Sequence, residues 1–303
     1  MGTTRNQFAE KQIGPILARF FSSGVLKGLA RTGRSQIATN LFHHYQFFKG
    51  FDADLSVGEF YDCIFDKLVF EYRHEYIYKN AIAEKILLGK HSLNTAFMLT
   101  EFKADKCKAD AVVLNGTSHV YEIKSEMDSY ERIDNQIIAY KKIFDYITII
   151  TTERLFKAVC ERVPAEVGVM VLAEKNYRFM TKNCRRDAKS NKLNVDSSVI
   201  FESLHRGEYI KIIKDVLGKS FCGVPNTKVH NEAKEYFSKI PPEIAHDKMV
   251  EVLTNRRQAK HLSSFVCDVP HSLKAASISM RLTKDERCRF VGIMNDKMLN
   301  VFA

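Results

Sequence analysis

The sequence lacks the patterns that mark several common classes of protein. Its seven cysteines are odd in number and scattered, with no Cys-x-x-Cys pair, so neither a disulfide framework nor a zinc site is expected. No apolar run approaches the roughly 18 residues that a membrane span requires, and the first residues contain no apolar signal segment. Gly24, Gly28 and Gly33 lack the spacing of a phosphate loop. We therefore expect a cytoplasmic protein that does not contact a membrane.

The composition indicates a globular protein with one main core and additions. Hydrophobic residues make up 45% of the 303 residues, and the chain has no low-complexity tract or internal repeat. One αβ core needs about 150 residues. We predict a helical N-terminal region over 1–74, a core over 75–220 and a helical C-terminal region over 221–303. The C-terminal region is expected to bind nucleic acid, or to dock a protein partner or a second copy of the chain.

Positive charge is concentrated in two segments. The net charge is +10, and residues 1–50 and 175–192 each carry seven Lys or Arg against one acid. Such concentration is expected for a polyanion partner, which is bound by phosphate contact and counterion release. The alternative is a solvated basic surface. We predict that the second segment follows a phosphate backbone beside the active site, with contacts from Lys175, Arg178, Lys182, Arg185, Arg186, Lys189 and Lys192.

The most informative stretch carries charged residues within two short β-branched runs. Asp110 precedes the run 111–114, and Glu122 and Lys124 flank Ile123 at the end of the next run. Charged residues are depleted in strands and costly to bury unpaired. Because side chains alternate between the two faces of a strand, Glu122 and Lys124 project from the same face. We therefore expect these charges to bind a ligand.

The turn between the two runs decides whether Asp110 joins Glu122. A two-residue turn pairs Leu114 with Thr117 and puts the two acids on opposite faces. A three-residue connection, in either register that it allows, puts them on one face. We predict the odd-length connection, for example with Leu114 opposite Ser118. The residues expected to face the other way as core are Ala111, Val113, Tyr121 and Ile123.

Two converging carboxylates beside a lysine suit a hard divalent cation such as Mg²⁺ or Mn²⁺. Such a metal can acidify a bound water and neutralise the charge that builds on a phosphoryl oxygen. Lys124 would orient the nucleophile or stabilise the same charge. The alternative for this pattern is a hairpin that carries a surface ion pair.

The surrounding segments predict a defined order of elements. A helix is expected over 75–88, strands over 95–101 and 146–151, and a long helix over 125–146. Together with the two runs of the hairpin, the order is helix, three strands, helix, strand. On the long helix, polar residues recur every fourth position, at Asp128, Arg132, Gln136 and Tyr140.

This combination resembles the PD-(D/E)XK nuclease superfamily in its variant with a Gln-x-x-x-Tyr helix. The resemblance covers about a quarter of the chain, over 75–152, and is closest to an uncharacterised bacterial and prophage branch. It is carried by Asp110, Glu122-Ile-Lys124 and Gln136-x-x-x-Tyr140, and by Tyr78-Lys-Asn-Ala-Ile82, His91-Ser-Leu-Asn-Thr-Ala96, Leu99-Thr-Glu-Phe102 and Lys108-Ala-Asp110.

The resemblance implies a site and a fold. Asp110 and Glu122 would hold Mg²⁺ or Mn²⁺, Lys124 would act on the attacking water or the transition-state charge, and Gln136 and Tyr140 would line the site. The implied fold is α/β, with a restriction-endonuclease-like αβββαβ core and helical N- and C-terminal additions. The family often carries a further acid. We favour Glu101, with Glu84 and Glu75 as alternatives.

The implied activity is metal-dependent hydrolysis of phosphodiester bonds, and DNA is the expected substrate. A role in phage defence or mobile-element biology follows from the resemblance alone. The alternative is a non-catalytic nucleic-acid-binding or protein-interaction module that keeps the nuclease fold. At single residues, the alternatives are a strand-end ion pair for Glu101 and a polar helix edge for Gln136 and Tyr140.

Overall fold

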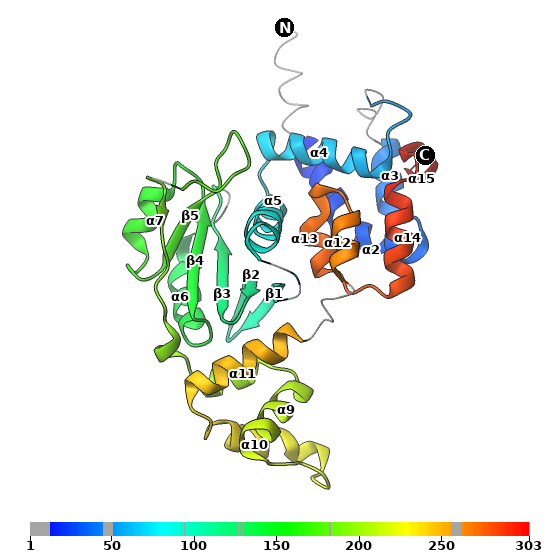
Figure 1. The fold of residues 1–303 in the computed structure, drawn as a ribbon. Coiled ribbons are helices and arrows are strands. Elements are labelled where there is room, and N and C mark those ends of the chain that lie inside the picture. The colour runs from blue at the N-terminus through cyan, green and yellow to red at the C-terminus, as the bar shows by residue number, and fades with distance from the viewer. Residues whose placement is uncertain are drawn as a thin grey trace. The chain divides into compact units, whose positions relative to one another are not determined.

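The chain forms a mixed α/β protein that divides into two units (Figure 1). The computed structural model describes residues 13–44, 51–91, 93, 95–126, 128, 130–181, 183–255 and 262–302. The helical unit comprises Met1–Gly89, Glu174–Tyr177 and Lys260–Ala303, and the sheet unit comprises Lys90–Ala173 and Arg178–Ala259.

The helical unit joins two stretches that are far apart in the sequence. The first contains η1 (Arg19–Phe21), α2 (Ser23–Thr32), α3 (Gln36–His44), α4 (Val57–Glu71), α5 (Glu75–Ala81) and the π-helical η3 (Ile82–Leu88). The second contains α12 (Leu262–Asp268), η7 (His271–Leu273), α13 (Lys274–Ser279), α14 (Lys284–Met294) and α15 (Met298–Phe302). Phe20, Phe60 and Phe302 meet edge to face, with ring centroids 5.3, 5.6 and 5.9 Å apart, so both stretches share one core.

The sheet unit contains a six-stranded mixed sheet in the order β1-β2-β3-β4-β5-β6. Its strands are β1 (Phe97–Ala104), β2 (Cys107–Leu114), β3 (Ser118–Ile123), β4 (Tyr146–Thr151), β5 (Gly168–Val171) and β6 (Arg185–Arg186). The first three strands are antiparallel neighbours, β3, β4 and β5 run parallel, and β6 is antiparallel to β5. The predicted order of helix, three strands, helix, strand is therefore present.

The helix in the connection between β3 and β4 is shorter than predicted. The structure has η4 (Tyr130–Arg132) and α6 (Ile133–Lys141) where one helix over 125–146 was expected. Before them, the Asp128 carboxylate accepts hydrogen bonds from the backbone N–H and the hydroxyl of Ser125, at 2.8 and 2.6 Å. Asp128 thus holds a turn, which is a frequent role for Asp outside a helix.

The main core of the sheet unit lies on the face of the sheet that carries Glu122. Val112 and Val120 pack there with Ile137 and Tyr140 of α6. The four residues expected to form the core on the opposite face are buried as predicted, with exposed fractions of 0 to 5%: Ala111, Val113, Tyr121 and Ile123. The expectation is corrected in one respect: the face that carries the site is also a core face.

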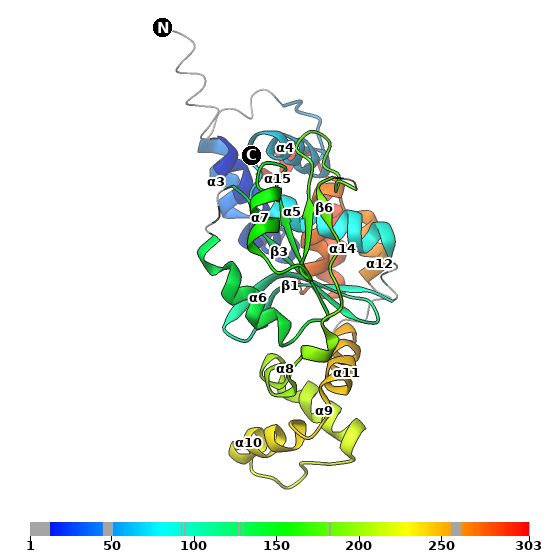
Figure 2. The same ribbon diagram turned by 90° about the vertical axis from the view of Figure 1, so that its left-hand side faces the viewer.

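Beyond the sheet, four helices extend the same hydrophobic core. They are α8 (Ser197–Ser203), α9 (Arg206–Leu217), α10 (Asn226–Phe237) and α11 (Pro242–Thr254), and Figure 2 shows them at one end of the sheet. Two further helical elements precede them, α7 (Phe156–Arg162) and η5 (Lys192–Asn194).

The helices α8 and α9 are separated by a short non-helical break in the chain. Leu204 is extended, with ψ of 151°. The Glu208 carboxylate then accepts a hydrogen bond from the backbone N–H of His205, at 2.7 Å, which caps the start of α9. The left-handed Gly218, with φ of 68°, ends α9.

The three consecutive regions expected from the sequence do not coincide with the two units. The helices α10 and α11 share the core of the sheet unit, while residues 262–302 belong with the N-terminal helices. Among the described residues, no helix is long and apolar enough to cross a membrane.

Candidate active site

The register of the β2–β3 hairpin matches the odd-length prediction. Leu114 lies opposite Ser118 and Ala111 lies opposite Tyr121, so three residues connect the strands. Gly116 occupies the left-handed region there, with φ of 67°. Continuing this register by one residue brings Asp110 opposite Glu122.

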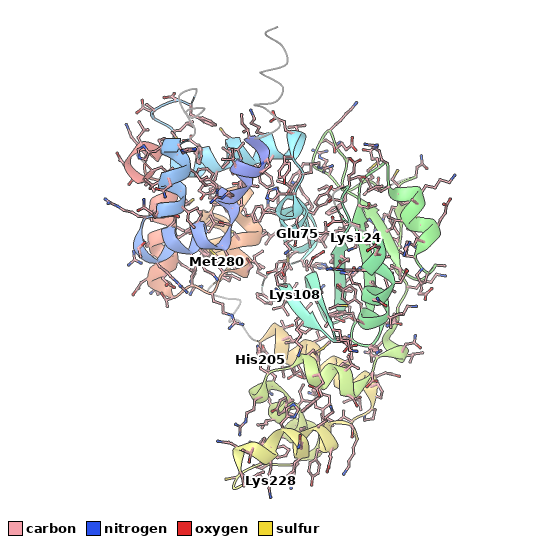
Figure 3. The ribbon with its side chains drawn as sticks, turned by 180° about the vertical axis from the view of Figure 1, so that it is seen from behind. Glu75, Lys108, Lys124, His205, Lys228 and Met280 are labelled. Carbon is pink, nitrogen blue, oxygen red and sulfur yellow. The ribbon has the colours of Figure 1, made fainter. Side chains whose placement is uncertain are left out.

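Glu122 is the centre of a buried polar cluster. Its side chain is 3% exposed, and Nζ of Lys124, the residue that Figure 3 labels on the sheet, lies 3.1 Å from its Oε1. The same Oε1 accepts a hydrogen bond from Gln136 Nε2, and Oε2 accepts one from the Tyr140 hydroxyl at 2.6 Å. Four of the residues predicted to form the site therefore meet around one carboxylate: Glu122, Lys124, Gln136 and Tyr140.

The elements that carry these residues fix their positions. The backbone N–H of Lys124 donates to the carbonyl of Ile150 at 2.8 Å, and the Thr151 hydroxyl donates to the carbonyl of Lys124 at 2.8 Å, so β4 holds the residue after β3 in place. Gln136 and Tyr140 stand four residues apart on α6 and therefore face the same side of that helix.

Burial dominates the electrostatics of the cluster. Burial raises the pKa of the Glu122 carboxyl, against the charge of Lys124 and the hydrogen bonds from Tyr140, Lys124 and Gln136, which lower it. Burial and the neighbouring Glu122 also raise the pKa of Tyr140, so its hydroxyl remains a proton donor. A buried ion pair contributes little net stability even when it is hydrogen-bonded. Stability alone therefore does not account for this pair.

Asp110 lies at the end of the β2–β3 ladder. Its Oδ2 accepts a hydrogen bond from the backbone N–H of Ile123 at 2.8 Å. Its charge contributes to the raised pKa of Tyr140, which places it near the Glu122 cluster. The residue is half-buried.

Glu101 lies beside Asp110 on the neighbouring strand in a strained conformation. The pairs Thr100↔Ala111 and Phe102↔Ala109 flank it, and its φ of 55° lies in the left-handed region. A non-glycine residue held there costs roughly 1 to 3 kcal/mol, and such strain is concentrated at functional sites.

Of the three candidates for the further acid, the sheet unit offers Glu101. A carboxylate oxygen of Glu101 lies within 4.8 Å of one of Asp110. Glu101 also pairs with Lys108 at 2.9 Å, so the strand-end ion pair is present as well. Glu75 and Glu84 belong to α5 and η3 of the helical unit.

The donor set fits a hard cation. Carboxylate oxygens are the ligands that Mg²⁺ and Mn²⁺ prefer. Asp110 and Glu101 provide such oxygens at close range. A carboxylate has about four acceptor sites, and the donors around Glu122 use three of them.

Three of the seven basic residues in the connection over 175–192 are engaged by other groups of the protein. The guanidinium of Arg186 donates to the carbonyls of Val167, Cys160 and Pro164 at 2.9, 3.0 and 3.1 Å, beside the end of α7. Two other basic residues of this segment form ion pairs, Arg185 with Asp187 and Lys192 with Asp247, both at 2.6 Å. Lys182 lies outside the described residues. Lys175, Arg178 and Lys189 are exposed.

Sequence reasoning missed a buried joint between α11 and the sheet. His246 is fully buried, and its Nε2 forms a 2.7 Å hydrogen bond with the hydroxyl of Ser118 on β3. The same hydroxyl accepts a hydrogen bond from the backbone N–H of Asp145 at 3.1 Å. No sequence signal points to this joint, because His246 and Ser118 are 128 residues apart.

The sheet unit places the chain among mixed α/β proteins with a six-stranded sheet. The chain belongs to the family described as Bacteriophage P4 protein cII, which it matches over residues 69–279. Protein cII of Enterobacteria phage P4 is 31% identical over 87 residues, which are 29% of this chain and 33% of that protein. The match therefore spans about a third of the length of this relative. The expected link to phage proteins is confirmed at the level of the family.

A solved structure also resembles part of the chain. It is the SPO1766 protein of unknown function from Silicibacter pomeroyi, which is 19% identical and covers 46% of this chain and 91% of its own, with a TM-score of 0.31.

Proposed function

We propose that this protein is a metal-dependent nuclease of the PD-(D/E)XK type that hydrolyses phosphodiester bonds in DNA. The observation that carries the proposal is the buried carboxylate of Glu122, which is bound by Lys124, Gln136 and Tyr140 at the end of β3. In this proposal the strands β1 to β4 with α5 and α6 correspond to a restriction-endonuclease-like αβββαβ core.

Asp110 and Glu122 are the proposed ligands of Mg²⁺ or Mn²⁺, and Glu101 is the proposed third acid. When bound, the cation supplies positive charge to the phosphoryl oxygens and acidifies a water. Tyr140 and Gln136 hold the Glu122 carboxylate in one orientation. Lys124 orients the attacking water or stabilises the charge that develops on the phosphate.

The net charge of +10 supports a polyanionic substrate. The strained backbone of Glu101 beside Asp110 supports a binding role for that pair. A place in phage defence or mobile-element biology is proposed only from the phage origin of the family.

One observation favours a second candidate, a non-catalytic module that keeps the nuclease arrangement and binds nucleic acid or a protein. The side chains of Glu122 and Lys124 are only 3% and 8% exposed, and three donors already surround the carboxylate. The hydrogen-bonding groups of such a buried cluster have partners within the protein and need no bound ligand.

A cleavage assay distinguishes the two candidates. Purified protein is incubated with linear, circular and single-stranded DNA and with RNA, in Mg²⁺, in Mn²⁺ and in EDTA. We expect cleavage of DNA with a divalent cation and none in EDTA. Asp110→Asn keeps an acceptor for the Ile123 N–H but removes the charge, and Glu122→Gln removes the charge of the cluster, so both should abolish cleavage while binding persists.

Glu161→Gln is the matched control, because this exposed acid on α7 gives the same change in net charge away from the site. It should cleave as wild type does. Wild-type protein that binds DNA but leaves every substrate intact would favour the non-catalytic module, and unaltered cleavage by Asp110→Asn would overturn the proposed ligand set.

A further inference from the structure

The hairpin that joins β1 to β2 carries three exposed lysines, Lys103, Lys106 and Lys108, here called the hairpin lysines. Ala104 lies opposite Cys107, so the connection is the two-residue turn Asp105-Lys106, with Asp105 at φ of 54°. A left-handed residue at this position is typical of a tight two-residue hairpin. The lysines therefore stand on a short and well-defined turn.

Acids of the protein compensate these lysines only in part, since Lys108 pairs with Glu101 and Lys103 acts electrostatically on Glu202 of α8. Lys103 and Lys108 lie directly opposite each other in the antiparallel ladder. Like charges in that position repel and destabilise the pair of strands. Neither Lys103 nor Lys106 forms an ion pair or a side-chain hydrogen bond with a residue that the structure describes. A bound anion would relieve this repulsion.

Protection of a sheet edge accounts for only one of the three lysines. Lysines on edge strands discourage pairing with another sheet, and β1 is the strand at the edge. Lys106 lies in the turn, however, and Lys108, which Figure 3 labels, lies on β2, which is not the edge strand although only its residues 111–114 pair with β3. The set as a whole therefore needs another explanation.

The hairpin lies next to the candidate site, because Lys108 contacts residues of that site. Lys108 Nζ lies 2.9 Å from the Glu101 carboxylate, and the carbonyl of Lys108 accepts a hydrogen bond from the Tyr140 hydroxyl at 3.3 Å. Asp110 follows two residues later on the same strand. A phosphate backbone that contacts the hairpin lysines is thereby brought toward the carboxylates.

We propose that the hairpin lysines, rather than the basic connection over 175–192, are the main phosphate-binding surface of the sheet unit, and that they hold the backbone of duplex DNA. This inference rests on the proposed nuclease function and names where its substrate is held. It differs from the expectation for the basic connection, in which Arg185, Arg186 and Lys192 contact carbonyls or acids of the protein itself.

The test compares two double variants with the same change in net charge. Lys103→Gln with Lys106→Gln removes two hairpin lysines and leaves Lys108, which touches the site, in place. The control, Arg178→Gln with Lys189→Gln, removes two exposed charges of the basic connection. Binding of the full-length chain to a fluorescent DNA duplex in EDTA is measured by anisotropy over a range of salt concentrations, and cleavage is measured separately in Mg²⁺.

Each phosphate contact contributes about 0.9 to the slope of log K against log salt for a duplex, and about 0.7 for a single strand. We expect the hairpin variant to lower the slope by about 1.8 on the duplex and the control to leave it within about 0.3 of wild type. The control variant should cleave DNA as wild type does, whereas the hairpin variant should need a higher DNA concentration to reach half of its maximal cleavage rate.

Three results would overturn the proposal. If the salt slope of the hairpin variant equals that of wild type while wild type cleaves DNA, the hairpin lysines are not the phosphate-binding surface, and the proposed nuclease function is unaffected. Equal flattening in both variants means that net charge alone is measured. If wild-type protein binds neither duplex nor single-stranded DNA, both the proposed nuclease function and the proposed phosphate-binding surface are wrong.

Discussion

At the scale of single residues, the donors around Glu122 determine how the candidate site responds to change. Oε1 accepts from Lys124 and Gln136, and Oε2 accepts from Tyr140. Because the carboxylate is almost fully buried, removing one donor leaves its charge with less compensation. A substitution here therefore affects stability as well as chemistry.

Lys124→Met should slow single-turnover cleavage by about 10² to 10³-fold, because the ammonium that stabilises the transition-state charge is lost. It should also lower the free energy of unfolding by about 3 kcal/mol at neutral pH, since an unpaired carboxylate stays buried. Stopped-flow or quench assays and urea titrations measure the two effects.

The loss of stability should depend on pH. The pKa of Glu122 is already raised in the folded protein. The stability that Glu122 contributes through this shift is therefore fully present below its ordinary pKa of 4.5, and it is lost as the pH rises through the pKa of the folded state. Without Lys124 the folded pKa rises further. The gap in stability between wild type and Lys124→Met should therefore widen as the pH rises from about 4.5. Glu122→Gln combined with Lys124→Met removes both charges and should recover most of the stability without recovering cleavage.

At the scale of elements, Arg186 stabilises the end of a helix rather than a bound phosphate. Its guanidinium donates to three carbonyls at or just after the end of α7, at 3.1 Å or less. Cations near a helix C-terminus bind carbonyls that have no partner within the helix. The neighbouring Arg185 pairs with the exposed Asp187.

Arg186→Ala should lower the free energy of unfolding by about 2 kcal/mol, because several charge-assisted hydrogen bonds are lost together. Arg185→Ala is the matched control and should change it by less than about 0.5 kcal/mol. Chemical denaturation followed by circular dichroism gives both values. Equal stability of the two variants would show that the carbonyls of α7 find water as readily as the guanidinium.

At the scale of the whole sheet unit, the joint between His246 and Ser118 ties α11 to the sheet. Burial lowers the pKa of His246, while Asp247 and Asp145 act in the opposite direction and Lys192 adds to the lowering. The imidazole is therefore neutral in the folded protein. A buried His that must charge on unfolding gives acid sensitivity.

The stability that neutral His246 contributes is present above its ordinary pKa of 6.5. It is lost as the pH falls through the lower pKa of the folded state. Wild-type protein should lose stability between about pH 6.5 and 4.5 for this reason. His246→Gln should lose less over that interval, although it starts from a lower stability. Thermal unfolding across a pH series measures the difference, and His230→Gln on α10, a half-exposed site, is the control. Parallel pH profiles for wild type and His246→Gln would contradict the assignment.

The sequence by itself determined the features that depend on neighbouring residues. The strand period and the length of the turn at Gly116 brought Asp110 opposite Glu122, and a spacing of four on a helix brought Gln136 and Tyr140 to one carboxylate. The order of elements from α5 to β4 followed from the same local patterns.

Only the tertiary structure decided what depends on residues far apart in the chain. It buried Glu122 with Lys124, engaged Arg186 with the carbonyls of α7, and joined His246 to Ser118. It also placed the C-terminal helices 262–302 with the N-terminal ones, against the three consecutive regions expected. The physical reason is that burial and carbonyl capping are set by whichever distant segment packs nearby, and no local period encodes that choice.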